Sequence, residues 1–336
     1  MIKNILFVHN GISFFKPDLE ILKKYFNVDD YNFENSKNIF VLLFRYIKFL
    51  IFLLKNLKKY DLFFIWFADY HSFLPVLFSK LFHKKSIINL GGYDVTYIPY
   101  LKYGAFSNPI RSFATGFSIH YANINLAVAQ SLKKEALKRV PKAKISVIPT
   151  GYDFKNQTIG KNKENIILTV GRVDSFNRFI IKGIDFFVKL AKEMPQYKFV
   201  AIGLSEDSKR YIKTFPENLI ILPQQPKEIL DEYYSKAKIY AQFSLREGFP
   251  SAVCEAMLHG CIPIGTNVGA MKEIIGDTGF ILENRSIEKA KTYIKQAMNF
   301  NITKSIKSSN RIKNNFSLEK REKQLISIFQ KLNSIH

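Results

Sequence analysis

Two glutamates lie eight positions apart around a run of turn-forming residues in the stretch REGFPSAVCE, residues 246–255. Pro250 suits the first position of a helix, where no backbone N–H donor is needed, and Gly260 suits its end. This pattern predicts that Glu247 lies in the loop before a helix. Glu255 then lies on the helix, about a turn and a half from its start.

The backbone amides between the two glutamates are expected at the positive end of that helix. Gly248, Phe249 and Ser251 would supply these N–H groups, which together with the helix dipole attract anions. Two carboxylates that accept hydrogen bonds from hydroxyl groups would lie beside them. A phosphate joined to a polyol, as in a nucleotide-sugar, fits such a site.

Two basic residues upstream indicate the same chemistry. The apolar run 167–170 ends in Gly171 and Arg172, and Lys182 follows ten residues later, before another expected helix. A guanidinium fork and a lysine point charge at one sheet edge could neutralise a diphosphate. Either residue alone would suit a surface salt bridge, but their order ahead of the two glutamates favours a ligand site.

Apolar, strand-like runs alternate with helical patterns along the chain, which predicts an α/β fold with parallel sheets. The polar segment 152–164 reads as a linker, so two doubly wound domains would join near residue 155. Ligands in such sheets bind at the carboxyl ends of the strands. The expected strands are 4–9, 62–66, 86–90, 125–129 and 145–149, then 166–170, 198–202, 219–222, 239–243, 261–265 and 278–281.

The composition fits a basic, folded protein of two domains. The chain has 336 residues, 47% of them hydrophobic, and a net charge of +22 that is spread over both halves. This charge favours anionic partners: nucleic acid, acidic lipid or phosphorylated substrates. Cys254 and Cys261 lie in apolar surroundings, and we expect reduced, buried thiols in a cytoplasmic protein. The first residues resemble a β-strand rather than a signal peptide.

The segment 39–57 predicts an apolar helix with one basic stripe. Arg45 and Lys48 interrupt it, so no uncharged run reaches the roughly 18 residues that a membrane span needs. Lys55 and Lys59 fall on the same side as these two residues. The segment could be a core helix with one solvated face, or an interfacial helix on an anionic membrane at the inner face of the plasma membrane.

The order of these motifs, VGR…KG.D…EGFPSAVCEAM, resembles the retaining glycosyltransferases of family 4. Their Glu-x7-Glu segment is matched by Glu247 and Glu255. Residues 146–153 (SVIPTGYD) resemble the family's hinge motif, and residues 87–96 (IINLGGYDVT) resemble a subset with Gly-Gly-x-Asp. The resemblance is strong over residues 146–280 and weak before residue 86.

The resemblance implies the GT-B fold, in which two doubly wound parallel-sheet domains face a central cleft. Residues 1–153 would bind the acceptor, with a last helix over about 317–336 crossing back onto them, and residues 154–316 would bind the donor. The expected reaction moves a sugar from a UDP- or GDP-sugar to a hydroxyl of a glycan or lipid-linked acceptor. The expected pathway is the synthesis of cell-envelope polysaccharide or lipopolysaccharide.

The resemblance also implies roles for the residues of the donor site. Arg172 and Lys182 would bind the donor diphosphate, helped by the loop Gly248, Phe249, Pro250 and Ser251. Glu255 would accept hydrogen bonds from the ribose, and Glu247 would contact the transferred sugar near the reacting centre.

Three further residues and one absence complete these expectations. The nucleotide base would lie near Gln225, and Gly11 would let the backbone approach the phosphates. Asp94 would orient or activate the acceptor hydroxyl, or else cap a short helix. The sequence contains no Asp-x-Asp, so we expect neither a metal nor another cofactor.

Two rival functions are open at this stage. A nucleotide-sugar epimerase of the same fold would form product without any acceptor. The net charge would also suit a nucleic-acid-binding protein, but the basic residues form no aromatic-interleaved patch or known binding motif, so nucleic acid is not an expected partner.

Overall fold

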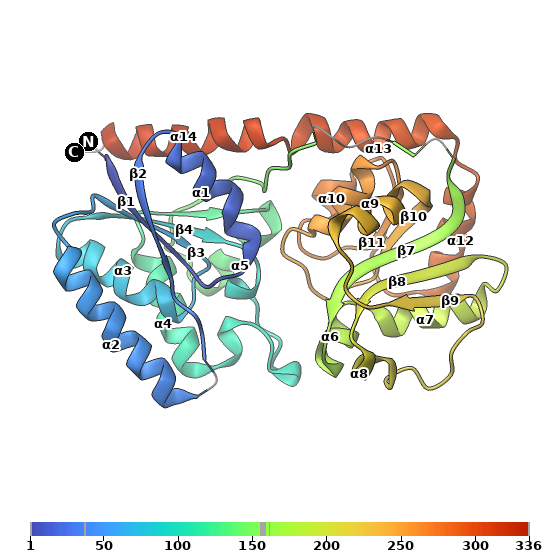
Figure 1. Ribbon diagram of the computed structural model, residues 1–336, viewed down its shortest axis with the longest axis horizontal. Coiled ribbons are helices and arrows are strands. Elements are labelled where there is room, and N and C mark those ends of the chain that lie inside the picture. The colour runs from blue at the N-terminus through green and yellow to red at the C-terminus, as the bar shows by residue number, and fades with distance from the viewer. Residues whose placement is uncertain (1, 37, 155–158, 161, 335–336) are drawn as a thin grey trace. The chain divides into compact units, whose positions relative to one another are not determined.

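A computed structural model describes residues 2–36, 38–154, 159–160 and 162–334 (Figure 1). The chain forms two compact units. The first comprises Met1–Gly151 and Leu318–His336, and the second comprises Tyr152–Ser317. Each unit has its own six-stranded sheet in the order given below. The predicted α/β architecture of two doubly wound domains is therefore confirmed.

The sheet of the first unit has the order β2-β1-β3-β4-β5-β6, and all its neighbouring strands are parallel. Helices cover both of its faces (Figure 1). The strands are β1 Asn4–His9, β2 Asn27–Asn32, β3 Leu62–Trp66, β4 Lys85–Leu90, β5 Ile124–Ala127 and β6 Ile145–Val147. The α-helices are α1 Lys16–Lys23, α2 Ile39–Asn56, α3 Tyr70–Leu81, α4 Pro109–Tyr121, α5 Gln130–Arg139 and α14 Leu318–Ser334.

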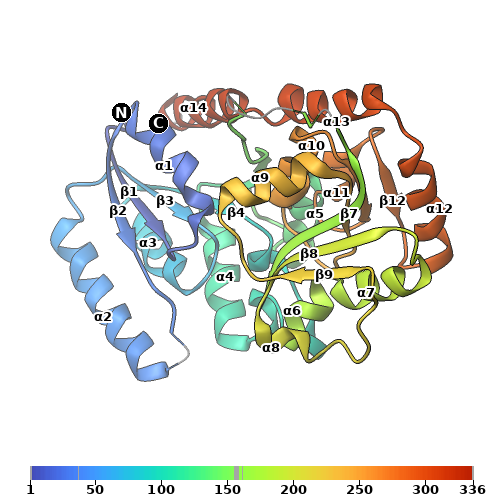
Figure 2. The ribbon, with the colours of Figure 1, turned by 45° about the vertical axis from the view of Figure 1, so that its right-hand side comes forward.

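The sheet of the second unit has the order β12-β11-β10-β7-β8-β9 and is also parallel throughout. The helices α9, α10 and α13 pack on one face, and α7 and α12 pack on the other (Figure 2). The strands are β7 Glu164–Val173, β8 Lys198–Leu204, β9 Leu219–Leu222, β10 Ala237–Gln242, β11 Ile262–Thr266 and β12 Phe280–Leu282. The helices are α6 Phe176–Ile181, α7 Ile184–Glu193, α8 Glu206–Lys209, α9 Lys227–Lys236, α10 Ser251–Leu258, α11 Met271–Ile275, α12 Ile287–Met298 and α13 Ile302–Asn315.

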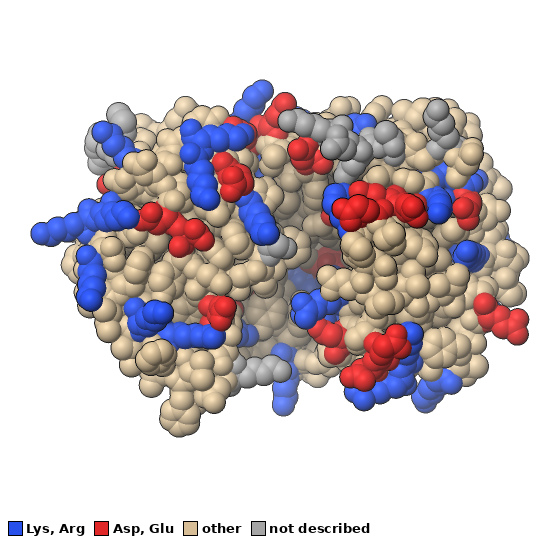
Figure 3. Space-filling model, viewed as in Figure 1, with Lys and Arg blue, Asp and Glu red and all other residues tan. Residues whose placement is uncertain are grey.

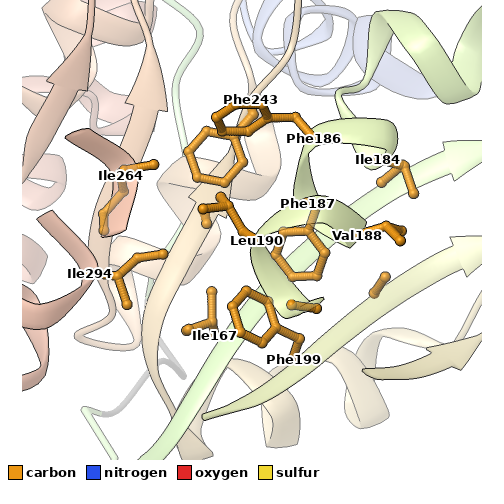
Figure 4. Packing of buried hydrophobic residues seen from close by; sticks show 14 of the residues in the cluster. Ile167, Ile184, Phe186, Phe187, Val188, Leu190, Phe199, Phe243, Ile264 and Ile294 are labelled. Carbon is orange, nitrogen blue, oxygen red and sulfur yellow. The ribbon is translucent and has the colours of Figure 1, made fainter. Parts of the chain in front are cut away.

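The core between this sheet and α7 follows from the two periodicities of strand and helix. Ile167 on β7 and Phe199 on β8 point to the same face of the sheet, where they meet Phe187 and Leu190 of α7 (Figure 4). Ile294 of α12 closes the cluster, and all five side chains are buried. Because this layer holds the strands rigidly, it fixes where the loops at their carboxyl ends begin.

The structure corrects three local expectations. Strand β2 was not predicted because its sequence, NVDDYN, is polar; it pairs with β1 alone, at the edge of the sheet. Pro250 is the N-cap residue of α10, one position before the helix, rather than its first residue. Within the expected linker 152–164, residues 155–158 and 161 lie outside the described residues, and β7 already begins at Glu164. None of the described helices is long and apolar enough to cross a membrane.

The last helix, α14, is attached to the first unit by a buried ion pair. Arg321 of α14 is 2% exposed and donates from Nε and Nη2 to the carboxylate of Asp18, at 2.5 and 2.6 Å. Its Nη1 donates to the carbonyl oxygens of Ile148 and Pro149, and Trp66 donates to Asp18 from its indole nitrogen. Both buried charges thus have hydrogen-bond partners, which is the condition for tolerating them.

We expect the substitution Arg321→Met to lower the free energy of unfolding of the first unit by about 3–5 kcal/mol, because it leaves the Asp18 carboxylate buried without its counter-charge. Urea unfolding followed by circular dichroism measures this loss. The control is Lys323→Met on the exposed face of the same helix, which should change stability by no more than about 0.5 kcal/mol. Equal effects of the two substitutions would contradict a stabilising role for the ion pair.

Candidate functional site

Glu247 lies in the loop after β10 and is held by three side chains. Lys182 donates to both of its carboxylate oxygens from Nζ, at 2.8 and 3.1 Å. Gln242 and Ser244 donate to Oε1, at 2.5 and 2.7 Å. Glu247 is only 8% exposed. Hydrogen bonds to an ionised group are stronger than neutral ones, so this network fixes the carboxylate in one orientation.

Gln242 and Ser244 were not among the predicted site residues, although the sequence contains a signal for them. Gln242 is the last residue of β10, Ser244 follows two positions later, and both are buried. A buried amide must find hydrogen-bond partners, and here Tyr240 donates to Oε1 of Gln242 at 3.1 Å. This bond orients the amide so that its NH2 group faces Glu247.

Two glycines allow the loops of this site to approach one another. Gly183, with φ of +75°, follows Lys182, and a Cβ there would lie 2.1 Å from the carbonyl oxygen of Phe243. Gly269, with φ of +53°, passes as closely to the carbonyl oxygens of Glu247 and Gly248. Only glycine adopts these backbone angles without cost, and only glycine leaves room for the contacts. The predicted Lys-Gly pair thus places Lys182 beside Glu247.

The amino end of α10 adjoins this network. The loop of Gly248 and Phe249 leads into Pro250, and Ser251 is the first helical residue. No side chain caps this end of the helix. The first N–H groups of a helix lack acceptors within the helix, so this end can bind an anion. The ring of Phe249 packs against Tyr152 and Phe316, which holds the loop in place.

Glu255 lies in the second turn of α10 and is half-buried. Burial raises the pKa of its carboxyl, while the charge of Lys227 and a hydrogen bond from Tyr234 act in the opposite direction. The Tyr234 hydroxyl donates to Oε2 at 3.3 Å. One carboxylate oxygen therefore has a protein partner, and the group can still accept hydrogen bonds from a ligand.

Arg172 is the last residue but one of β7, and it lies where the register of the pairing with β8 shifts. Its side chain is 72% exposed, and Nε lies 3.1 Å from Asp174. An exposed pair of this kind contributes little to stability, so the guanidinium can exchange Asp174 for a ligand at small cost. The structure pairs Lys182, but not Arg172, with Glu247.

Two further predicted residues belong to other elements than those of this cluster. Gln225 follows β9, the edge strand, and its exposed amide donates to the carbonyl oxygen of Pro223. Gly11 lies in the first unit after β1, with φ of +82°, and donates to Nδ1 of His9 at 3.0 Å. Both cysteines are buried and free, as the sequence predicts.

Asp94 belongs to the first unit and is fully buried in a short 3-10 helix, Tyr93–Val95. Its carboxylate accepts from the backbone N–H groups of Gly91, Gly92 and Ala68. Burial raises its pKa to about 6, against these three hydrogen bonds. Asp94 thus lies inside the short helix rather than capping it, and its carboxylate holds the Gly91–Gly92 turn in place. A role toward an acceptor stays a prediction.

The profile of the family described as Glycosyl transferases group 1 matches residues 152–332 of this chain. The chain belongs to this family. The second unit, which carries the Lys182–Glu247 pair and the amino end of α10, lies within the matched residues, and so does most of α14.

Individual relatives agree with this assignment. The α-galactosylglucosyldiacylglycerol synthase of Streptococcus pneumoniae is 29% identical over 135 residues, which are 35% of this chain and 36% of that protein. The chain spans less than half the length of the curated relatives that it matches. Sucrose-phosphate synthase from Thermosynechococcus elongatus has the same fold, with a TM-score of 0.79 at 16% identity over 99% of this chain and 100% of that one. Anabaena Alr3699/HepE, solved in complex with UDP-glucose, gives a TM-score of 0.74 at 12% identity over 98% and 99% of the two chains.

Proposed function

We propose that this glycosyltransferase is a retaining enzyme that moves a sugar from a UDP- or GDP-sugar to a hydroxyl of a glycan or lipid-linked acceptor. The supporting observation is the arrangement at the carboxyl edge of the second sheet. There Glu247, paired with Lys182, precedes the amino end of α10, and Glu255 lies in the second turn of that helix. Cations, backbone amides and hydroxyl-binding carboxylates match the diphosphate, ribose and sugar of such a donor.

Each group of the donor has a protein counterpart in this proposal. Lys182 and Arg172 bind the diphosphate with the amides of the α10 end, and Glu255 accepts from the ribose hydroxyls. Glu247 faces the hydroxyls of the transferred sugar. The UDP-glucose bound by Anabaena Alr3699/HepE, which shares the fold, supports a nucleotide-sugar as the donor.

The reaction breaks the bond between the sugar's anomeric carbon and the diphosphate oxygen, which leaves with the electron pair. The acceptor oxygen bonds to the same face of that carbon and passes its proton to the departing diphosphate oxygen, so the anomeric configuration is kept. Negative charge grows on the leaving diphosphate. The ammonium of Lys182 and the guanidinium of Arg172 stabilise that charge, and a preorganised cation is effective at such a point.

The first unit (Met1–Gly151 and Leu318–His336) is proposed to receive the acceptor, and the second unit (Tyr152–Ser317) is proposed to hold the donor. Asp94 acts there as a positioning residue that keeps the Gly91–Gly92 loop in shape. The glycolipid named for the Streptococcus pneumoniae relative supports a lipid-linked acceptor. The synthesis of cell-envelope polysaccharide or lipopolysaccharide is the pathway that we propose.

A thermal-shift panel of UDP- and GDP-sugars tests the donor class, because a ligand that binds the native state raises its melting temperature. The donor that shifts the melt is then incubated with lipid and glycan acceptors, and NMR determines the anomeric configuration of the product. An inverted configuration would contradict the retaining mechanism. Product that forms equally well without acceptor would instead indicate an epimerase.

We expect transfer to continue at an unchanged rate after dialysis against EDTA. The proposed mechanism places the diphosphate charge on Lys182 and Arg172, and the sequence has no Asp-x-Asp to chelate a cation. The measurement compares initial rates of treated enzyme with and without added Mg²⁺. A strict requirement for Mg²⁺ or Mn²⁺ would contradict this assignment of the charge.

A further inference from the structure

Helix α2 (Ile39–Asn56) presents apolar side chains on two opposite faces. One face packs into the first unit through Leu42, Phe49 and Leu53, which are buried. A helix at a protein surface ordinarily carries polar residues on its other face. Here that outer face carries large apolar side chains: Phe40 is 78% exposed, Phe44 68%, Ile47 50%, Ile51 46% and Leu54 56%.

The exposed residues form one continuous stripe rather than scattered contacts. They follow each other at intervals of four and three residues, which is the spacing of neighbours on one side of a helix. Figure 3 shows uncharged surface, interrupted by Lys and Arg side chains, where α2 runs along the lower left of the picture. Contiguous apolar surface of this kind marks an interaction site, whereas isolated exposed apolar residues do not.

A second apolar patch lies on α4, and α3 packs against both α2 and α4. Ile110 and Phe113 of α4 are each 68% exposed. Phe113 and Phe117 contact Phe73 of α3 at ring distances of 6.0 and 4.9 Å. The first unit therefore exposes apolar and aromatic residues on more than one element.

The charged residues of α2 itself are all positive. The helix contains no acidic residue, and Lys48 and Lys55 form no ion pair with any residue that the structure describes. Arg45, which the sequence placed in the same basic stripe, is instead tied to the preceding loop through Glu34, at 2.9 Å. Lys59 likewise pairs with Asp29. The basic flank available to a partner thus consists of Lys48 and Lys55.

We propose that α2 docks the first unit onto an anionic lipid bilayer. The outer stripe enters the boundary between headgroups and acyl chains, and Lys48 and Lys55 contact the lipid phosphates. The cytoplasmic face of the plasma membrane is a surface of this charge. The helix lies on the bilayer, since no described helix can cross one.

A second copy of the chain is the competing occupant, because spacings of four and three also suit a coiled-coil seam. Such a seam uses flanking residues of both signs to pair the helices. In α2 the flanks are basic only, so two copies would bring like charges together, whereas an anionic bilayer neutralises them. The charge pattern therefore favours lipid. This inference stands independently of the proposed transferase reaction.

The test is co-sedimentation of the full chain with vesicles of phosphatidylcholine, with and without phosphatidylglycerol. We expect binding to the mixed vesicles that weakens as salt is raised, and weaker binding to phosphatidylcholine alone. Phe44→Ser with Ile51→Ser should lower the partition coefficient at least about tenfold on both kinds of vesicle. Lys48→Glu with Lys55→Glu should lower it on the mixed vesicles only.

The matched control is Phe215→Ser with Ile302→Ser, which changes residues of the second unit that are each 50% exposed. This variant should bind vesicles as the wild type does, and unchanged thermal melting shows that all variants are folded. Failure of the wild type to bind mixed vesicles would overturn the proposal. So would α2 variants that keep their vesicle binding but convert a dimer into a monomer in light scattering, which would assign the stripe to a second copy.

Discussion

Replacing Glu247 with glutamine should lower kcat by about two to three orders of magnitude without weakening the binding of free nucleotide. Glutamine keeps the shape of the side chain but removes the charge that aligns Lys182, 2.8 Å away. In the proposed mechanism the carboxylate also contacts the transferred sugar, where positive charge develops. Free nucleotide lacks that sugar. Its diphosphate can still bind Lys182, which the substitution releases from the ion pair with Glu247.

Calorimetric titration with free nucleotide and steady-state kinetics of transfer separate these two effects. Glu283→Gln is the matched control, because this exposed glutamate of the same unit also has a hydrogen bond, from Asn267. It should leave both quantities unchanged. If Glu247→Gln lost nucleotide affinity and kept its kcat, the assigned role of Glu247 would be wrong.

The substitution Glu255→Gln should act in the opposite way, through donor binding. Losing charge-assisted hydrogen bonds to the ribose costs roughly 1.5–3 kcal/mol, or about ten- to more than hundredfold in Kd. The kcat at saturating donor should change much less, because the ribose is remote from the bond that breaks. Titration with free nucleotide measures the loss, and a folded variant of unchanged affinity would contradict the ribose contact.

The pH dependence of donor binding provides an independent control for Glu255. Burial raises the pKa of this carboxyl above its ordinary value. As the pH falls from neutral, Glu255 therefore takes up a proton earlier than an exposed glutamate, and it loses the charge that the ribose hydroxyls would meet. Affinity for the sugar nucleotide should fall with it in the wild type. Glu255→Gln should lack this part of the pH dependence, and identical pH profiles would exclude Glu255 as its source.

Local sequence patterns determined much of this architecture. Strand β1 was predicted to the residue, because an apolar run of that length needs burial on both faces and so indicates a strand in a parallel sheet. The bounds of β9 were predicted as well, although it is an edge strand with only its first residue buried. The loop and helix around Glu247 and Glu255 could also be predicted from local sequence, because turn residues and helix formers act within a few positions. Strand β2 (Asn27–Asn32) shows the limit, because a polar edge strand lacks that pattern and is decided by its pairing with β1.

Only the tertiary structure decided which side chains meet. Lys182 and Glu247 are 65 residues apart in sequence, and their contact depends on Gly183 letting one loop pass against the end of β10. Gln242 and Ser244 belong to the site because a buried polar group must find a hydrogen-bond partner. The sequence alone does not show that this partner is Glu247. For α2, periodicity identified the helix but not its environment. α3 and the sheet bury only one face of α2, so Phe44 and Ile51 on the other face stay exposed. This burial depends on residues that are distant in sequence, and it distinguishes a core helix from a docking surface.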